Sequence, residues 1–130
     1  MKRFEDRIKS YLEERGWSKL RPSDLAKSIV IEGGELLEIF QWENRSSDEI
    51  KADSEKVKEI RKELADVMTY CFDMAVILEI DVEEMLNEKL DKVIEKYPAS
   101  LFNKESNSSD PGTENAYWEV KRKYRKEGKS

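Results

Sequence analysis

The chain has 130 residues, of which 38% are hydrophobic and 41% are charged, and its formal net charge is −5. This length predicts a single domain, and the acidic balance argues against a nucleic acid polymer as the partner. The chain contains no histidine, which excludes His-based nucleophilic triads, His-ligated zinc and the Glu-x-x-His signature of di-iron bundles.

The cysteine content and the hydropathy indicate the cellular compartment of the protein. The single cysteine, Cys71, cannot form an internal disulfide, so we expect a reducing, cytoplasmic location. The N-terminus is charged from Lys2 onwards, and we expect no signal peptide. No apolar run approaches the roughly 20 residues that span a bilayer, so a membrane is not an expected partner.

Hydrophobic periodicity predicts an all-α fold. Apolar residues spaced three and four apart predict four amphipathic helices, over residues 3–15, 24–43, 54–79 and 82–96. Gly16 ends the first of these helices and Pro98 ends the last. Residues 44–53 are polar and turn-rich, and we expect a loop there. The simplest architecture is a four-helix antiparallel bundle with a short basic helix after it.

Two of the predicted helices each carry a pair of acids three residues apart, Glu32 with Glu35 and Glu63 with Asp66. Residues at this spacing share a helix face, so two such helices packed together would gather four carboxylates. Neighbouring buried anions repel one another and lose hydration, and a cation relieves both costs. All-oxygen ligands suit Mg²⁺, with Mn²⁺ as a substitute. The alternative is a solvated acidic helix face.

The helix face that carries Glu63 and Asp66 continues beyond them. Tyr70 and Asp73 lie four and seven residues after Asp66 and therefore share its face. Cys71 instead falls on the apolar stripe, where we expect a packed small side chain and not a nucleophile.

Two adjacent glycines, Gly33 and Gly34, interrupt the second predicted helix beside its acidic pair. Each glycine costs roughly 1 kcal/mol relative to alanine in a helix interior. Two compatible explanations are close packing of another helix and space for phosphate beside the metal.

Several of these segments together resemble a known family. The segments Ile31–Trp42 and Glu63–Tyr70, followed by Lys89 and by Lys96-Tyr97-Pro98, resemble the all-α nucleoside triphosphate pyrophosphatases. The most similar group is the MazG-like proteins that include dCTP pyrophosphatase. Their pattern is Glu-x-x-Glu, a spacer and Glu-x-x-Asp, with residues 36–62 as the spacer here. The resemblance covers residues 17–98.

This resemblance implies Mg²⁺-dependent hydrolysis of a nucleoside triphosphate, such as dCTP or a modified analogue, to the monophosphate and pyrophosphate. The role would be house-cleaning of the nucleotide pool. The implied metal ligands are Glu32, Glu35, Glu63 and Asp66. The resemblance also places Trp17 and Trp42 around the base, and Tyr70 and Lys89 at the sugar or phosphate. Taken without the resemblance, Trp17 and Trp42 are more typical of core or interface positions. The alternative for Tyr70 is a core position, and for Lys89 a solvated surface position.

Two details of the implied site stay open in the sequence. A carboxylate beside the metal can accept the proton of the attacking water, and both Glu35 and Glu38 are candidates. Family members often carry asparagine four residues after the implied phosphate-binding lysine, whereas this chain has Val93. The preferred base is therefore not determined by the sequence.

The predicted domain organisation is a helical domain over residues 1–102 and a linker with a basic tail over residues 103–130. Residues 103–114 have the composition of a flexible linker, and residues 115–126 are expected to form the short basic helix. That helix is typically solvated or packed, and the alternative is that it covers a neighbouring subunit's nucleotide site. The lean apolar composition favours self-association, and the resemblance implies a homo-oligomer, either a dimer or a tetramer.

Other functions are compatible with the same residues. One is a non-catalytic helical interaction or regulatory module, which would show no metal-dependent binding of nucleotides. Another is a related hydrolase that prefers dUTP or phosphoribosyl-ATP. A panel of nucleotide substrates separates these functions.

Overall fold

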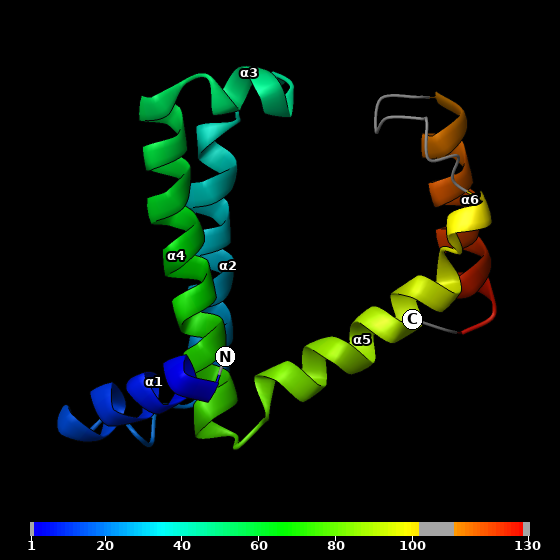
Figure 1. Cartoon of the computed structure of the whole chain (residues 1–130). Helices are drawn as coiled ribbons and strands as arrows, with labels where there is room; N and C mark the ends of the chain where they lie inside the picture. The colour runs from blue at the N-terminus through cyan, green and yellow to red at the C-terminus, as the bar shows by residue number, and fades with distance from the viewer. Residues whose placement is uncertain (1, 102–110, 129–130) are drawn as a thin grey trace. The chain divides into compact units, whose positions relative to one another are not determined.

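The computed structural model describes residues 2–101 and 111–128, with the side-chain surroundings of residues 3–101 and 117–128. The prediction of an all-α fold is confirmed, because no strand occurs in these two ranges. The helices are α1 (Lys2–Glu14), α2 (Pro22–Ile39), α3 (Ser47–Lys51), α4 (Ser54–Ile77), α5 (Val82–Lys96), the 3₁₀ turn η1 (Ala99–Leu101) and α6 (Pro111–Lys126) (Figure 1). None of the described helices is both long and apolar enough to cross a membrane.

The chain divides into two compact units, residues 1–83 and 84–130. The domain boundary predicted at residues 102 and 103 stays a prediction. The predicted flexible linker over residues 103–114 lies largely outside the described residues. Its last part belongs to α6, which begins at Pro111 rather than at residue 115.

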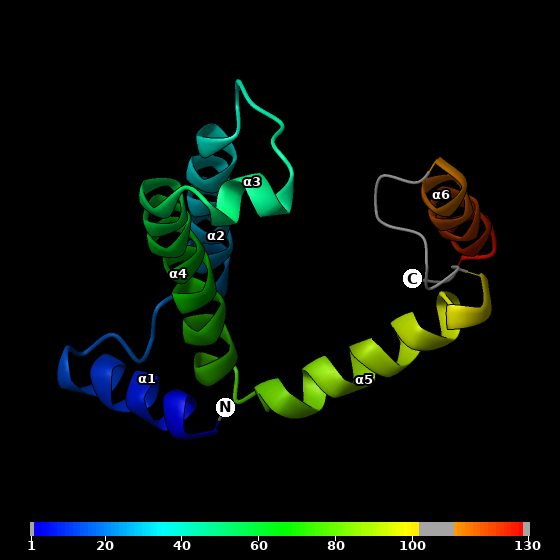
Figure 2. The same ribbon diagram turned by 45° about the horizontal axis from the view of Figure 1, so that its top comes forward.

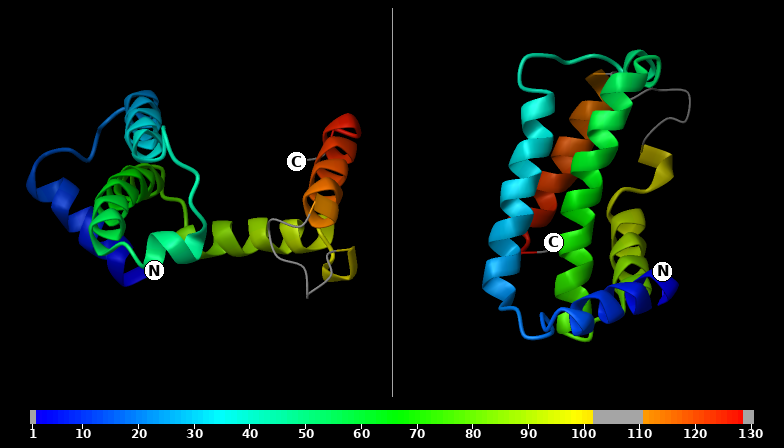
Figure 3. Two further views of the ribbon diagram at one scale, coloured as in Figure 1. Left: turned by 90° about the horizontal axis from the view of Figure 1, so that it is seen from above. Right: turned by 90° about the vertical axis from the view of Figure 1, so that its left-hand side faces the viewer.

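In the first unit, α2 and α4 lie side by side and run antiparallel (Figures 1 and 3). Helix α1 packs across the C-terminal end of α4 (Figure 2). The core forms at this crossing, from the buried side chains of Ile8, Leu12, Phe72, Ala75 and Val82. The long α2–α4 pair therefore projects from a small apolar core, and most of its facing surface is not occupied by core side chains.

A short helix, α3, lies within the segment that was predicted to be a loop. Ser46 and Glu49 form a capping box, in which the Glu49 backbone N–H donates to the Ser46 hydroxyl at 3.2 Å. Asp53 then caps α4 by accepting a hydrogen bond from the backbone N–H of Lys56 at 3.1 Å. The loop prediction for residues 44–53 was wrong because five helical residues are too few to show a periodic apolar face.

Helix α1 ends as predicted at Gly16, whose φ is +68°. The N–H of Trp17 donates to the carbonyl of Leu12 at 2.9 Å, and the N–H of Gly16 donates to the carbonyl of Glu13 at 3.2 Å. This is the Schellman motif, which favours glycine at the left-handed position. Glu79 occupies the equivalent position after α4, with φ +56°. The Gly16 turn fixes where Trp17 leaves α1.

The buried face of α4 differs from the predicted stripe. Cys71 is exposed, so its expected packed position was wrong. The buried side chains are Phe72, Asp73 and Ala75 instead. Apolar residues surround α4 in this region, and only the packing of α1 decides which of them become buried.

The second unit is held together by aromatic contacts between the end of α5 and α6. Tyr97 stacks on Tyr117 with ring centroids 5.0 Å apart and an interplanar angle of 13°. The Lys96 ammonium lies 4.9 Å from the centroid of the Tyr124 ring. These contacts attach the basic helix to the end of α5.

Candidate active site

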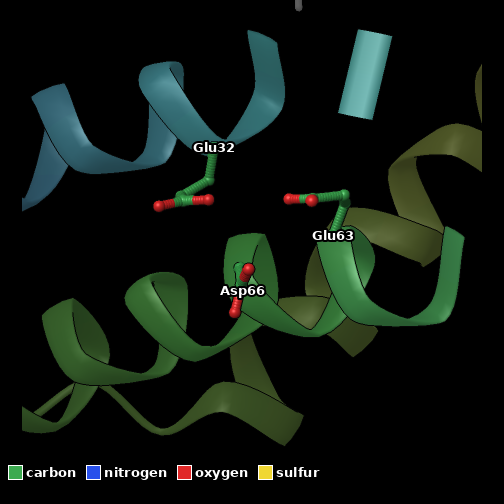
Figure 4. Close-up of side chains that lie close together, drawn as sticks. All are labelled: Glu32, Glu63 and Asp66. Carbon is green, nitrogen blue, oxygen red and sulfur yellow. The ribbon is translucent and has the colours of Figure 1, made fainter. Parts of the chain in front are cut away.

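The facing surfaces of α2 and α4 bring acidic side chains together. Glu32 comes from α2, and Glu63 and Asp66 come from α4, one helical turn apart. One carboxylate oxygen of each lies within 4.8 Å of the others. All three side chains are half-buried, and they point into the space between the two helices (Figure 4). The i, i+3 spacing on α4 is what aims two carboxylates at one residue of α2.

Glu35 lies beside these three residues, one turn further along α2. The hydrogen bond between the Glu35 and Glu32 side chains, together with the charge of Glu32, raises the pKa of Glu35 above its ordinary value of 4.5. Burial, and then the charge of Glu35, raises the pKa of Glu63. We call Glu32, Glu35, Glu63 and Asp66 the carboxylate cluster. It contains the three acids of the α2–α4 contact and Glu35, which interacts with two of them, and its Glu35 and Glu63 carboxyls have raised pKa values.

Two oxygens of the cluster lack the partners that buried polar atoms require. Oε2 of Glu32 and Oε2 of Glu63 are buried, and neither has a hydrogen-bond partner within the described part of the chain. An unpaired buried carboxylate oxygen is costly, and a divalent cation would satisfy both at once. An all-carboxylate donor set fits a hard ion such as Mg²⁺ or Mn²⁺.

A pocket of about 400 Å³ adjoins the carboxylate cluster and shares Asp66 with it. Its walls are the same faces of α2 and α4, closed at one end by α1 and the connector after it. The lining residues are Tyr11, Trp17, Leu20, Asp24, Leu25, Ser28, Asp66, Thr69, Tyr70 and Asp73. We call this space the α2–α4 pocket. Its mixture of aromatic and polar walls is typical of small-molecule sites.

Two of the four predicted substrate-binding residues lie in this pocket. Trp17 is 45% exposed, and its ring meets that of Tyr11 edge to face with centroids 5.8 Å apart. The Arg15 guanidinium lies 4.2 Å from the centroid of the Tyr11 ring. Tyr70 is half-buried and lies one turn after Asp66. Trp17 therefore lines the pocket in edge-to-face contact with Tyr11.

The other predicted residues are not part of the described pocket lining. Trp42 is 89% exposed, because α2 ends at Ile39 and not at residue 43, and it is outside the described pocket lining. Lys89 is exposed on α5, in the second unit. Glu38, the second candidate proton acceptor, is exposed, and its charge contributes to the raised pKa of Glu35.

Gly33 and Gly34 do not serve close packing within the described chain. A Cβ atom built on either glycine meets no described atom within 4 Å. The open space at these glycines leaves room for phosphate beside the carboxylate cluster, and it also leaves room for a helix of another copy of the chain.

The residue-by-residue prediction missed a role for Asp73. This side chain is only 5% exposed, lines the α2–α4 pocket, and has its Oδ1 without a hydrogen-bond partner among the described residues. Burial raises the pKa of its carboxyl. The sequence did indicate that Asp73 shares a helix face with Asp66 and Tyr70. The burial of Asp73 depends on the packing of α1, which residue spacing does not predict.

Comparison with known proteins identifies the family. A model of the MazG-like family matches residues 27–110, which is more than half of the chain. The chain belongs to the MazG-like family. The matched segment contains both acidic pairs of the carboxylate cluster, so the resemblance seen in the sequence is confirmed.

Curated relatives of this MazG-like chain include dCTP pyrophosphatase 1 of Mus musculus and of Homo sapiens. Each is 30% identical to it over 93 residues, which cover 70% of the chain and 55% of the relative. The chain thus spans about half the length of the curated relatives it matches.

A solved structure supports the same grouping. The crystal structure of a pyrophosphatase from Archaeoglobus fulgidus is 37% identical in sequence to the MazG-like chain, with a TM-score of 0.65. The match covers 75% of this chain and 92% of that one. Nearly the whole of the archaeal chain is therefore represented in the fold described above.

Proposed function

We propose that this chain is a metal-dependent pyrophosphohydrolase, which hydrolyses a nucleoside triphosphate to the monophosphate and pyrophosphate. The observation that carries the proposal is the carboxylate cluster, with two unpartnered buried oxygens, next to the α2–α4 pocket. The substrate class is a deoxynucleotide such as dCTP or a modified analogue, because the curated relatives are named dCTP pyrophosphatases.

Charge explains why a cation is needed. The chain is acidic, and a triphosphate would be repelled by four carboxylates unless a cation lay between them. Bound Mg²⁺ supplies Lewis-acid stabilisation of phosphoryl charge and lowers the pKa of a coordinated water. Glu32, Glu35, Glu63 and Asp66 would hold it. The fixed spacing of these acids on two packed helices keeps the donor set ready before the metal arrives.

Hydrolysis breaks the anhydride bond between the α and β phosphates, adds water across it, and releases one proton. We assign the proton to a carboxylate at the edge of the cluster, either Glu35 or Glu38. Glu35 interacts directly with Glu32 and Glu63, whereas Glu38 acts on Glu35 through its charge. Glu38→Gln should then lose turnover without losing metal binding if Glu38 is the base, and Glu35→Gln should lose both.

The pocket walls supply the remaining contacts that we propose. Trp17 stacks on the base and Tyr70 contacts the sugar or phosphate, because both line the pocket next to the cluster. Roles for Trp42 at the base and for Lys89 at the phosphate stay predictions, since neither residue lies in the described pocket lining.

We also propose that the protein acts as a homo-oligomer, a dimer or a tetramer, in cytoplasmic house-cleaning of the nucleotide pool. Large apolar side chains remain exposed on both long helices, including Val30, Ile31 and Leu37 on α2 and Leu64 and Met68 on α4. Exposed apolar surface of this extent is typical of an interface. Light scattering at several protein concentrations measures the oligomeric state.

The direct test is a panel of canonical and modified nucleoside triphosphates with Mg²⁺ and with EDTA, in which the products are resolved by phosphorus NMR. We expect monophosphate and pyrophosphate in equal amounts, with Mg²⁺ only. A protein that hydrolyses no member of the panel, or hydrolyses them equally in EDTA, would overturn the proposal.

A further inference from the structure

We propose that Asp73 reads the base, and that it selects nucleobases with an exocyclic amino group, as in cytosine, over those with a carbonyl at that position, as in uracil. This inference rests on the proposed function and extends it to a residue that neither acidic pair includes. It is carried by the burial of Asp73, by its missing partner and by its position in the α2–α4 pocket.

Asp73 is an unusual residue for a helix interior. Its side chain is 5% exposed, the one buried polar side chain among the described residues, and its neighbours Phe72 and Ala75 belong to the apolar core. Oδ1 of Asp73 has no hydrogen-bond partner in the described part of the chain. Buried polar atoms in folded proteins are nearly always paired, and an exception at the wall of a pocket points to a ligand as the partner.

The distance along α4 between Asp73 and the proposed metal site matches the length of a nucleotide. Asp66, Tyr70 and Asp73 all line the pocket and follow one another on a single helix face. Asp66 and Asp73 are seven residues apart, which is about 10 Å along the helix axis. A nucleotide is an extended chain of phosphates, sugar and base of comparable length. Phosphates held at Asp66 therefore bring the base to the level of Asp73.

The other pocket residues at this end suit a planar base. Trp17 and Tyr11 line the pocket from the connector and α1, and the face of an indole stacks on any nucleobase. Stacking does not distinguish bases of similar size. Asp73 would add a hydrogen-bonding group at the edge of the base, which stacking alone does not provide.

The chemistry of a carboxyl group sets the preference. An ionised carboxylate only accepts hydrogen bonds, and an amino group donates one to it. Cytosine offers its exocyclic amino group at C4, whereas uracil presents a carbonyl oxygen there, which an ionised carboxylate repels. Sites that hydrogen-bond a polar group of the substrate reject analogues lacking it much more strongly than apolar pockets do.

The experiment compares dCTP with dUTP, two substrates that differ at this edge of the base, in the full-length protein with Mg²⁺. The wild type should show kcat/KM at least tenfold higher for dCTP than for dUTP. Asp73→Asn replaces one accepting oxygen with an NH2 group that can donate to the uracil carbonyl, so the dCTP/dUTP ratio should fall at least tenfold, mainly through KM. Asp73→Ala removes the acceptor and should lower the ratio as well. The control Asp6→Asn, an exposed residue of α1, should leave the ratio unchanged.

The ratio is measured within one variant, so a smaller folded fraction does not alter it. Calorimetric binding of dCMP and dUMP in EDTA provides a second readout that needs neither metal nor turnover. We expect the wild type to bind dCMP more tightly than dUMP, and Asp73→Asn to lose this preference. Equal ratios in the wild type and both Asp73 variants would overturn the inference while leaving the proposed hydrolysis intact. A wild type without hydrolytic activity that still prefers dCMP would overturn the proposed hydrolysis alone.

Discussion

Two groups of acidic residues lie at different places along the α2–α4 pair, and their surroundings shift the pKa values in opposite directions. In the carboxylate cluster, the acids face one another, and the pKa values of Glu35 and Glu63 are raised. At the connection between the two helices, Glu43 and Asp53 each face a cation, and their pKa values are lowered. The same side-chain chemistry is thus destabilising at one position and stabilising at the other.

The connection is a closed network of charges. Lys56 of α4 contacts Glu43 at 2.8 Å and also donates to the Ile39 carbonyl, at the end of α2, at 3.3 Å. Arg45 binds Glu43 on one side and Asp53, at 3.1 Å, on the other. We call these residues the connection network. It joins the end of α2 to the start of α4 and so fixes how the two helices face each other.

The difference indicates which acids a bound cation would stabilise. Acids that serve stability are paired within the fold, as at the connection. Among the described residues, the acids of the cluster have no ion pair with a lysine or arginine, although the sequence is rich in both. Unpaired, half-buried carboxylates at the mouth of a pocket are typical of a site completed by a bound cation.

The largest expected effect comes from Glu63→Gln, which removes one charge from the cluster at nearly constant volume. Hydrolysis of the preferred triphosphate should fall by roughly 100-fold or more. In EDTA the melting temperature of the same variant should rise, because repulsion with Glu35 and Asp66 is relieved. Glu88→Gln, at an exposed position of α5, is the control and should change neither quantity appreciably. Loss of both activity and stability in Glu63→Gln would contradict the account.

The pH dependence of stability should separate the two regions. The pKa values of Glu43 and Asp53 are lowered, so their contribution is present above the ordinary values of 4.5 and 3.8 and is lost as pH falls through the folded values. The pKa values of Glu35 and Glu63 are raised above 4.5, so their penalty is absent in acid and grows as pH rises through the folded values.

Urea denaturation in EDTA between about pH 3 and about pH 8 measures this dependence, since these limits run from about one unit below the ordinary carboxyl pKa values to more than about three units above them. The free energy of unfolding should rise out of acid and then decline. Glu43→Gln should flatten the rise, and Glu63→Gln should flatten the decline. Identical curves for both variants would show that the two regions are not electrostatically distinct.

A smaller effect is expected from the connection network alone. Lys56→Met removes the cation that contacts Glu43 and the Ile39 carbonyl, and it should lower the melting temperature by a few degrees. Lys58→Met, at an exposed position of the same helix, should have little effect. Calorimetry of the two variants side by side tests whether the network joins the helices, and equal melting temperatures would exclude it.

The smallest effect is expected from Gly34→Ala, beside the cluster. The new Cβ meets no described atom within 4 Å, so alanine should stabilise α2 by about 1 kcal/mol through its higher helix propensity. Chemical denaturation measures this gain. Destabilisation would indicate that another copy of the chain packs against these glycines.

Much of the fold follows from local chemistry in the sequence. The limits of α4 were predicted within two residues because a polar segment precedes it and the apolar spacing of three and four runs without interruption from Val57 to Leu78. Gly16 marked the end of α1 for the same kind of reason. Helix α2 was predicted too long because Phe40 and Trp42 continue its pattern while no glycine or proline marks its end.

The candidate site likewise has one part that the sequence predicted and another part that it did not. The i, i+3 acidic pairs were sufficient to expect the carboxylate cluster, because each pair depends only on the geometry of one helix. Burial of Asp73 and exposure of Cys71 depend on how α1 crosses α4, which is a long-range contact that no local spacing encodes. The pocket that adjoins the cluster is a product of that crossing and could not be predicted.

The most direct test of the central claim is calorimetric titration of Mg²⁺, and of Mn²⁺, into protein freed of metal with EDTA. We predict saturable binding to the wild type, and binding at least tenfold weaker in Glu32→Gln, which removes one of the unpartnered oxygens from the carboxylate cluster. A wild type that binds neither ion, or a Glu32→Gln variant that binds them equally well, would contradict the account.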